Sequence, residues 1–282
     1  MKQPTIANKK VTRYILQRFG IHMSKRLGQN FLIDANIVQG IVDAANVQEN
    51  DRVLEIGPGI GTLTQALAET GAEVTCVELD KRLPEVLAHT LDAYDNVRVI
   101  QGDILKVNIP EIMGDKPFKV VANLPYYITT PIIMALLEKH LPITDIVVMV
   151  QKEVAERICA KKGKERSVLT LAVEYYGTGE YLFTIPKEFF NPVPKIDSGF
   201  ISIKFYNDRR YEKLIPENIF FKYVKAAFSN KRKNIANNLS TLGISKDEVK
   251  KKLEILGISP NERAENLKIE QFIKLAECFE EN

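Results

Sequence analysis

The stretch that decides the fold is RVLEIGPGIGTL, residues 52–63. Its first five residues are mainly apolar, as in a buried strand, and glycines follow at positions 57, 59 and 61. A glycine-rich turn between a strand and a helix lets a ligand approach bare backbone, next to the unpaired N–H groups that begin the helix. The stretch therefore predicts a strand, a ligand-binding turn and a helix in succession.

Short runs rich in valine and isoleucine follow and alternate with helical patterns. They are apolar on both faces, which is typical of a mainly parallel sheet covered by helices on both sides. We therefore predict an α/β fold with a mostly parallel, seven-stranded sheet. The expected strands are Arg52–Ile56, Glu73–Glu78, Val97–Gln101, Phe118–Ala122 and Ile146–Gln151, after a helix from Asp34 to about Asn46. Leu169–Tyr176 and Phe200–Phe205 lack a clear helix between them, so an antiparallel edge pair is expected there.

The pattern changes at the end of this α/β region. A polar Asn-Asp-Arg-Arg stretch begins at Asn207, and apolar residues then recur on one helical face. We expect an all-helical domain over residues 208–282 and an α/β domain over residues 24–207. Residues 1–23 are expected to form a basic helical arm, in which apolar residues at helical spacing end at Gly20.

Charge is distributed unevenly, although the net charge is only +3. No acidic residue occurs in residues 1–33 or in residues 218–246. Two such basic windows indicate a polyanion-binding face, with solvated helix faces as the alternative. The second window contains the candidate RNA-binding residues Lys222, Lys225, Lys231, Arg232 and Lys233. A targeting peptide is the alternative for the first window, but that window contains one serine and continues into a motif discussed below.

Cysteine and histidine usage argues against a metal centre. Cys76, Cys159 and Cys278 are odd in number and lack ligand-like spacing, and the three histidines stand alone. The apolar runs are too short to span a bilayer. We expect a cytoplasmic protein with no metal and no membrane segment.

Two acidic residues end the next two predicted strands. Glu78 lies about twenty residues after the glycine-rich turn, where a carboxylate can accept from both hydroxyls of a ribose. Asp103 closes the third strand, where it can hold an adenine amino group. Thr62 occupies the position at which a dinucleotide-binding motif has its third glycine, so the pattern favours a nucleoside without a pyrophosphate.

Asn123-Leu124-Pro125-Tyr126, after the fourth strand, suits methylation of an exocyclic amine. The lone pair of such an amine is delocalised into the ring. The Asn123 side-chain carbonyl and the Leu124 main-chain carbonyl can accept its two N–H bonds and draw it toward a tetrahedral geometry. Pro125 favours an extended Leu124, and Tyr126 offers a face for stacking an adenine. The alternative is an asparagine-initiated turn with a core tyrosine.

Together these motifs resemble the rRNA adenine dimethyltransferases, and within them the bacterial small-subunit, kasugamycin-sensitivity type. The resemblance extends from Lys25 over nearly the whole chain, and its motifs are residues 29–32, 55–59, 78–80, 123–126, 190–198 and 263–267. It implies a Rossmann-like class I methyltransferase that uses S-adenosylmethionine. It also implies that Tyr126 and Phe190 sandwich the target adenine. The residues implied to contact the donor are Asn30, Leu32, Gly57, Gly59, Glu78, Asp103 and Asn123.

The implied partner is 16S rRNA in an assembling 30S subunit, bound by a monomer. The target is two adjacent adenosines in the 3′-terminal hairpin loop, with Lys195 among the RNA contacts. The alternatives are a macrolide-resistance type of 23S rRNA methyltransferase and a non-catalytic ribosome-assembly factor. Two departures concern RNA contact: Lys231 stands where the family usually has arginine, and residues 161–167 lack an expected Tyr-Gly pair.

Overall fold

The computed structural model describes residues 4–24 and 27–281. The chain divides into two compact units. The first unit contains residues 1–155 and 180–204, and the second unit contains residues 156–179 and 205–282. Within the described residues, no helix has both the length and the apolar character needed to cross a membrane.

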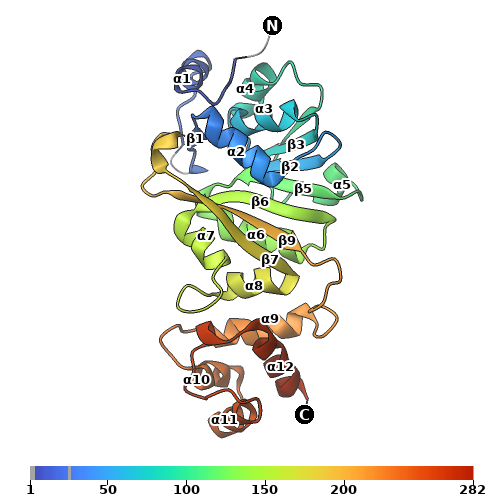
Figure 1. Cartoon of the computed structure of the whole chain (residues 1–282), viewed down its shortest axis with the longest axis vertical. Coiled ribbons are helices and arrows are strands. Elements are labelled where there is room, and N and C mark those ends of the chain that lie inside the picture. Colours follow the sequence, from blue (N-terminus) through green and yellow to red (C-terminus); the bar gives the residue numbers. More distant parts are fainter. Residues whose placement is uncertain (1–3, 25–26, 282) are drawn as a thin grey trace. The chain divides into compact units, whose positions relative to one another are not determined.

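A seven-stranded sheet with the order β4-β3-β2-β5-β6-β9-β7 forms the centre of the fold (Figure 1). The first five of these strands in the sheet order are parallel, and β9 runs antiparallel to β6. The predicted α/β fold with a mostly parallel sheet is therefore confirmed. The strands are β2 (Arg52–Ile56), β3 (Glu73–Glu78), β4 (Val97–Gln101), β5 (Phe118–Asn123), β6 (Ile143–Gln151), β7 (Gly177–Ile185) and β9 (Ser198–Phe205).

The predicted edge pair was partly wrong. Residues 168–176 form the helix α8 (Val168–Tyr176), and the strand beside β9 is β7. Ser167 and Thr170 form a capping box that starts α8, and seven of its nine residues are buried. A short segment buried on nearly all sides has no clear period, so its sequence is compatible with a strand or a helix.

Helices cover both sides of the sheet in the first unit (Figure 1). The helix α2 follows Asp34, the predicted first residue of this helix, whose side chain caps it by accepting from the main-chain N–H groups of Asn36 and Ile37. Figure 1 shows α2 and α3 on one side of the strands and α6 on the other. The helices are α1 (Lys9–Arg18), α2 (Ala35–Ala45), α3 (Thr62–Glu69), α4 (Leu83–Thr90), α5 (Ile109–Met113), α6 (Thr129–Glu138) and α7 (Lys152–Ile158).

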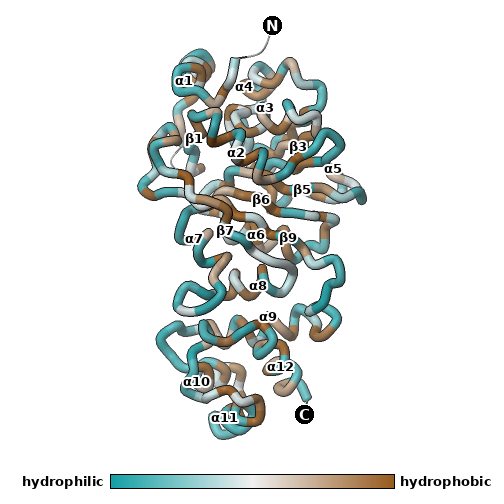
Figure 2. Tube along the Cα trace, viewed as in Figure 1, coloured by the Kyte–Doolittle hydropathy of each residue, from teal (hydrophilic) through white to brown (hydrophobic). Residues whose placement is uncertain are grey.

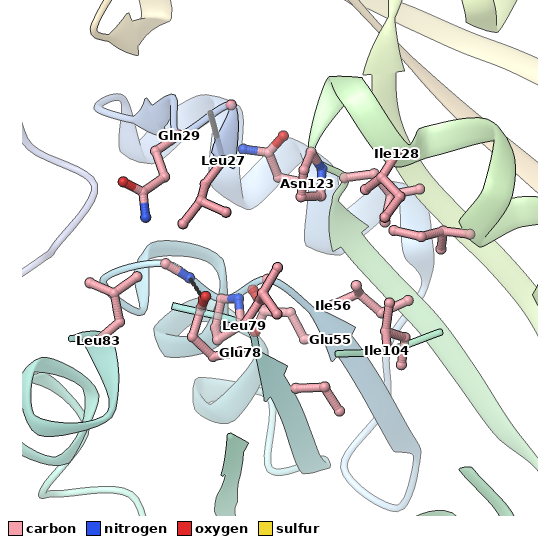
Figure 3. A pocket seen from close by; sticks show the side chains of 18 of the residues that line it. Leu27, Gln29, Glu55, Ile56, Glu78, Leu79, Leu83, Ile104, Asn123 and Ile128 are labelled. Carbon is pink, nitrogen blue, oxygen red and sulfur yellow. Dashed lines mark hydrogen bonds between the residues drawn. The ribbon is translucent and has the colours of Figure 1, made fainter. Parts of the chain in front are cut away.

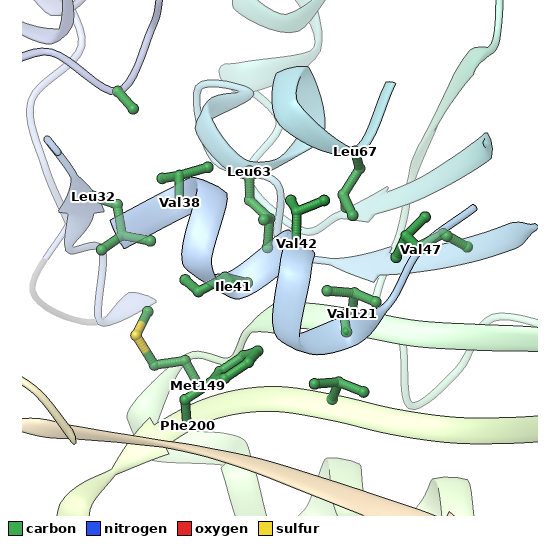
Figure 4. Packing of buried hydrophobic residues seen from close by; sticks show 14 of the residues in the cluster. Leu32, Val38, Ile41, Val42, Val47, Leu63, Leu67, Val121, Met149 and Phe200 are labelled. Atoms are coloured by element: carbon green, nitrogen blue, oxygen red, sulfur yellow. The ribbon is translucent and has the colours of Figure 1, made fainter. Parts of the chain in front are cut away.

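The main core lies between α2, α3 and the sheet. Val38 and Ile41 of α2, Leu67 of α3, Val121 of β5 and Met149 of β6 belong to one buried cluster (Figure 4). Burying such a side chain contributes roughly 1.5–3 kcal/mol relative to leaving it in water. This packing holds the strand ends, and the loops that follow them, in fixed positions.

The N-terminal helix packs against the first unit as well. Asn8 caps α1, and Ile15 and Leu16 share a second buried cluster with Leu83 and Leu87 of α4. The basic residues of α1 lie outside this contact and are exposed; they are Lys9, Lys10, Arg13 and Arg18. The predicted amphipathic helix is therefore confirmed over Lys9–Arg18. The predicted arm also includes residues 1–3, which lie outside the described residues.

The second unit is helical. Stacked and edge-on aromatic rings of Tyr175, Tyr176, Phe220 and Phe221 form part of its core. Figure 2 shows the contrast with the sheet: β5 and β6 are largely hydrophobic, whereas α11 is mainly hydrophilic. The helices of the second unit are α8, α9 (Glu217–Ala227), α10 (Ile235–Leu239), α11 (Lys246–Ile255) and α12 (Ile269–Glu280).

Candidate functional site

A pocket lies at the carboxyl ends of β2, β3 and β5 in the first unit. It contains about 970 Å³ of space free of protein atoms, part of it open to solvent. Residues 27–32, which precede the sheet, form one wall, and Figure 3 shows Glu78 and Leu79 across the pocket from Gln29 and Asn123. Ligands of open α/β sheets bind at this edge.

The glycine-rich turn needs its glycines for conformation and for space. Gly57, Gly59 and Gly61 all have positive φ, at +70°, +61° and +91°. A Cβ atom on Gly59 would lie 2.8 Å from Cε1 of Phe31, which is too close for any side chain. The glycines of the turn therefore bring main chain to the pocket surface.

The helix α3 begins at this turn without a side-chain cap. Its first residue, Thr62, lines the pocket and is buried, and among the described residues its hydroxyl has no hydrogen-bond partner. A buried hydroxyl without a partner is costly. The start of α3 thus offers both a hydroxyl and helix-terminal N–H groups to a polar ligand.

Glu78 lies at the end of β3 and is only 6% exposed. Its carboxylate accepts from the main-chain N–H of Gly59 (3.1 Å) and from that of Asp80 (2.7 Å). Burial raises the pKa of Glu78, and the two backbone hydrogen bonds oppose that rise. The side chain is therefore fixed beside the glycine-rich turn, as an acceptor for ligand hydroxyls requires.

Beneath the turn, Glu55 of β2 is 1% exposed and lies 3.5 Å from the thiol of Cys76. Burial raises the pKa of Glu55 to about 7, opposed by hydrogen bonds to Thr64 and Cys76. Burial also raises the pKa of the Cys76 thiol, so the thiol is protonated and can donate to the carboxylate. Glu55 ties β2 to β3 and α3 below the pocket.

Asn123 ends β5, and its side-chain nitrogen donates to the main-chain carbonyl of Asn30 at 3.2 Å. Asn30 in turn donates to the carbonyl of Gly28 at 3.0 Å. Since one N–H of the Asn123 amide is engaged by the protein, its carbonyl oxygen is held in a fixed direction, and this oxygen and the second N–H are the polar groups left for a ligand. The main-chain N–H of Leu124 donates to Met149 (3.1 Å), which fixes the backbone that carries the second predicted acceptor.

Tyr126 lines the pocket and its hydroxyl lies 2.6 Å from the Ser198 hydroxyl at the start of β9. Burial raises the pKa of Tyr126, so the phenol stays neutral at physiological pH. The hydrogen bond restrains the ring. Tyr127, the next residue, is 52% exposed and also lines the pocket.

The structure brings the predicted donor-site residues together in the pocket. The lining residues include Asn30, Leu32, Gly57, Gly59, Glu78, Asp103, Asn123, Leu124, Pro125 and Tyr126. Asp103 is half-buried, and its carboxylate accepts from the N–H of Leu105 at 3.1 Å. These residues come from five separate segments of the chain that meet at one edge of the sheet.

Phe190 is the predicted site residue that does not line this pocket. It lies in β8 (Phe190–Asn191), which pairs antiparallel with β1 (Phe31–Leu32) so that Phe190 is opposite Leu32. Its ring is 1% exposed and belongs to the main buried cluster. In this structure Phe190 supports the wall that carries Leu32 and offers no open face to an adenine.

The predicted RNA-binding residues are all exposed. Lys195 lies in the first unit, and the others lie in the second unit. Lys222 is paired with Glu280 at 2.6 Å and lies over the ring of Tyr223. Lys231, Arg232 and Lys233 lie between α9 and α10.

Several pocket residues were not predicted from the sequence. Gln29 belongs to a quoted motif and Tyr127 directly follows one, but neither had an assigned role. The position of Gln29 at the pocket depends on its contact with Asp80, which is distant in the chain. Leu79 and Ile104 follow the two predicted acids directly. Both could have been predicted from the sequence, because a residue that directly follows an acid at the end of a strand lies at the same edge of the sheet.

Two solved structures have a fold similar to that of this chain. A dimethyladenosine transferase from Plasmodium falciparum is similar with a TM-score of 0.73 and 27% identity, over 87% of this chain and 95% of that chain. The 23S rRNA methyltransferase ErmE is similar with a TM-score of 0.69 and 27% identity, over 88% of this chain and 98% of that chain. The fold is that of a class I methyltransferase.

Sequence comparison narrows this class. A family model described as ribosomal RNA adenine dimethylase matches residues 20–281. Relatives named ribosomal RNA small subunit methyltransferase A include that of Fusobacterium nucleatum, 55% identical over 91% of this chain and 97% of the relative. That of Clostridioides difficile is 44% identical over 96% of each chain. The chain belongs to the ribosomal RNA adenine dimethylase family, and the predicted enzyme class, an S-adenosylmethionine-dependent rRNA adenine dimethyltransferase, is confirmed.

Proposed function

We propose that this protein dimethylates the N6 amines of two adjacent adenosines in the 3′-terminal hairpin loop of 16S rRNA, with S-adenosylmethionine as donor. The observation that carries the proposal is the hydrogen bond from Asn123 to the carbonyl of Asn30. It leaves the Asn123 carbonyl oxygen as an acceptor beside Tyr126, in a pocket that also contains the glycine-rich turn. The names of the curated relatives support the small-subunit target.

The acceptor end of the pocket activates the amine by accepting hydrogen bonds. The Asn123 side-chain carbonyl and the Leu124 main-chain carbonyl take the two N–H bonds of the amine, which bends it toward a tetrahedral geometry and frees its lone pair. Tyr126, held by Ser198, stacks on the adenine, which is worth about 1–3 kcal/mol per base. These groups act by alignment and electrostatics.

The donor end fits S-adenosylmethionine. Glu78 would accept from the ribose hydroxyls, Asp103 would accept from the adenine amino group, and the partnerless Thr62 hydroxyl would meet a polar group near the start of α3. When bound, the donor supplies an electrophilic methyl group on a sulfonium and leaves as a neutral thioether. The methylated amine is strongly acidic, so the carbonyl oxygens of Asn123 and Leu124 hold its proton until water removes it, and no strong base is needed.

Exposed basic residues would bind the rRNA backbone. Loop adenines are partly unstacked, so moving one into a pocket costs less than it would in a duplex. Lys195 and the cluster Lys231–Lys233 would add affinity that weakens with salt. The proposed setting is cytoplasmic assembly of the 30S subunit, with the protein acting as a monomer.

Methyl transfer to defined substrates tests this function. The protein is incubated with labelled S-adenosylmethionine and with 30S subunits, 50S subunits or naked 23S rRNA that lack the modification, and the product nucleoside is identified by mass. We expect dimethyladenosine on 30S subunits alone. Label only on 23S rRNA would contradict the small-subunit target, and tight 30S binding without label would leave an assembly role.

A further inference from the structure

One wall of the pocket is held from outside the sheet. Residues 27–30 line the pocket but precede the first strand of the sheet. Such a segment needs its own attachments to keep a fixed position. Three polar side chains, those of Gln29, Asp80 and Arg82, provide them, and none of the three has a role in the proposed chemistry.

Gln29 bridges two parts of the chain that are 51 residues apart. Its amide nitrogen donates to the Asp80 carboxylate at 2.8 Å, and its amide oxygen accepts from the main-chain N–H of Ser24 at 2.8 Å. Both ends of the side chain are therefore used. The amide links the wall segment to the turn that follows β3.

Arg82 completes the link on the other side of Asp80. Its guanidinium donates twice to the Asp80 carboxylate, at 2.6 and 2.9 Å, and once to the main-chain carbonyl of His22 at 3.0 Å. The Asp80 carboxylate thus receives hydrogen bonds from Arg82 and Gln29 together. These contacts lower the pKa of Asp80 to about 2, so it is ionised at physiological pH.

The same turn holds the donor-site carboxylate. The main-chain N–H of Asp80 donates to Glu78 at 2.7 Å, two residues before it. At the other end of the wall segment, Asn30 accepts from Asn123. Residues 27–30 are therefore attached at one end to the turn of Glu78 and at the other to the methyl-acceptor motif.

We propose that Gln29, Asp80 and Arg82 form a clasp that positions residues 27–30 for donor binding. This inference rests on the proposed function, because it takes the pocket to be the S-adenosylmethionine site. Gln29 and Arg82 are positioning residues that act through Asp80 and the main chain. The clasp fixes the distance between the two walls before the donor arrives, which lowers the ordering cost of binding.

The test variant is Gln29→Ala, with Gln39→Ala as its matched control. Gln39 is an exposed glutamine of α2 that donates to Asp43 at 2.8 Å and does not line the pocket. Its replacement therefore also deletes one amide–carboxylate hydrogen bond, but leaves the clasp contacts in place. Binding of S-adenosylhomocysteine is measured by calorimetry, which needs no turnover. KM for S-adenosylmethionine and kcat are measured on 30S subunits, and thermal denaturation reports folding.

We expect Gln29→Ala to raise the Kd for S-adenosylhomocysteine and the KM for the donor by about tenfold, with kcat changed by less than about threefold. The Gln39→Ala control should bind as the unaltered protein does. A folded Gln29→Ala protein with unchanged Kd overturns the clasp. If Gln29 had only a structural role, Gln29→Ala would instead lower the melting temperature, and KM and kcat would change by similar factors.

Asp80→Asn gives a second measurement if Gln29→Ala fails to fold. An asparagine keeps only one of the two acceptor oxygens, and its NH2 would face a donor of Arg82 or Gln29, so a rise in Kd of about tenfold or more is expected. A folded Asp80→Asn protein with unchanged Kd would overturn the clasp. If the unaltered protein binds S-adenosylhomocysteine but does not methylate 30S subunits, the proposed target fails while the binding data still decide the clasp. If the unaltered protein does not bind it at all, the clasp fails as well.

Discussion

The pocket of the first unit and the basic surface of the second unit use polar residues in opposite ways. In the pocket, Glu78 and Asn123 are held by hydrogen bonds from or to the main chain, and each has a fixed direction. Lys231 and Lys233 are exposed side chains whose contribution depends on charge and not on one geometry. In the pocket, a single substitution should therefore cause a large loss of activity. On the basic surface, each substitution should weaken RNA binding by a small amount, and these amounts should add.

The largest expected effect comes from the pocket. Asn123→Ala removes the side-chain acceptor for the amine, and we expect kcat on 30S subunits to fall by a factor of about 100–1,000, as for loss of one oriented group in an active site. Binding to 30S subunits, measured by filter retention, should change by less than about twofold. Asn36→Ala, an exposed position on α2, is the control. Normal turnover of Asn123→Ala would refute the amine-orienting role.

The second unit also contains a fixed polar centre, that of Arg166, and this limits the contrast. Arg166 is buried, donates to both carboxylate oxygens of Glu174 at 2.6 and 2.9 Å, and donates to the carbonyls of Ala160, Lys161 and Leu267. It joins the loop before α8 to the segment before α12. Among the described residues its Nε atom is buried without a partner.

Removing this centre should destabilise the protein. For Arg166→Leu we expect the free energy of unfolding to fall by about 3 kcal/mol, because Glu174 and three carbonyls lose their donor and Glu174 is only partly exposed. Denaturant unfolding measures the change. Lys164→Leu, an exposed lysine of the same loop, should change it by less than about 0.5 kcal/mol. Equal changes in the free energy of unfolding for the two variants would show that the hydrogen bonds of Arg166 do not stabilise the second unit.

A pH-dependent effect tests the layer below the pocket. Burial raises the pKa of Glu55 from its ordinary value of about 4.5 to about 7 in the folded protein. Because the folded pKa is the higher one, the protonated carboxyl stabilises the fold at low pH, and this contribution is lost as the pH rises from 4.5 through 7. Glu55→Gln cannot ionise, so its free energy of unfolding relative to the unaltered protein should rise by about 2–3 kcal/mol over that interval. A pH-independent difference between the two proteins would contradict the burial of a titrating carboxyl.

The sequence predicted the first unit better than the details of its side chains. The strands β2, β3 and β4 were predicted at their observed bounds, because short runs rich in valine and isoleucine that alternate with helical patterns have few other solutions. The helix α8 was missed because a segment buried on nearly all sides lacks a period. The second unit also contains residues 156–179, which no change of composition marks.

The candidate site shows the same limit. Glu78, Asp103 and Asn123 were located from their positions at strand ends, and a parallel sheet brings strand ends together. The orientation of Phe190 depends on the pairing of β8 with β1, and the bridge from Gln29 depends on a turn 51 residues away. Contacts of this kind are decided by tertiary packing, so a pattern within one segment does not contain them.

The smallest expected effect concerns the basic surface and tests the contrast directly. Replacing Lys231, Arg232 and Lys233 together by glutamine removes three exposed charges from the cluster between α9 and α10. At low salt we expect the affinity for 30S subunits to fall about tenfold, and the slope of log affinity against log salt to flatten by about 2–3, while kcat at saturating subunits stays nearly unchanged.

The control removes the same number of charges elsewhere in the second unit: Lys250, Lys251 and Lys274 are exposed lysines outside the acid-free windows. Their replacement by glutamine should leave the salt slope nearly unchanged if the cluster is a specific RNA contact. Equal flattening by both triple variants would mean that the whole surface acts as a diffuse charge. An unchanged slope in the first variant would mean that the cluster is only solvated, and RNA affinity would then have to come from the first unit, where Lys195 and the basic face of α1 are the remaining candidates.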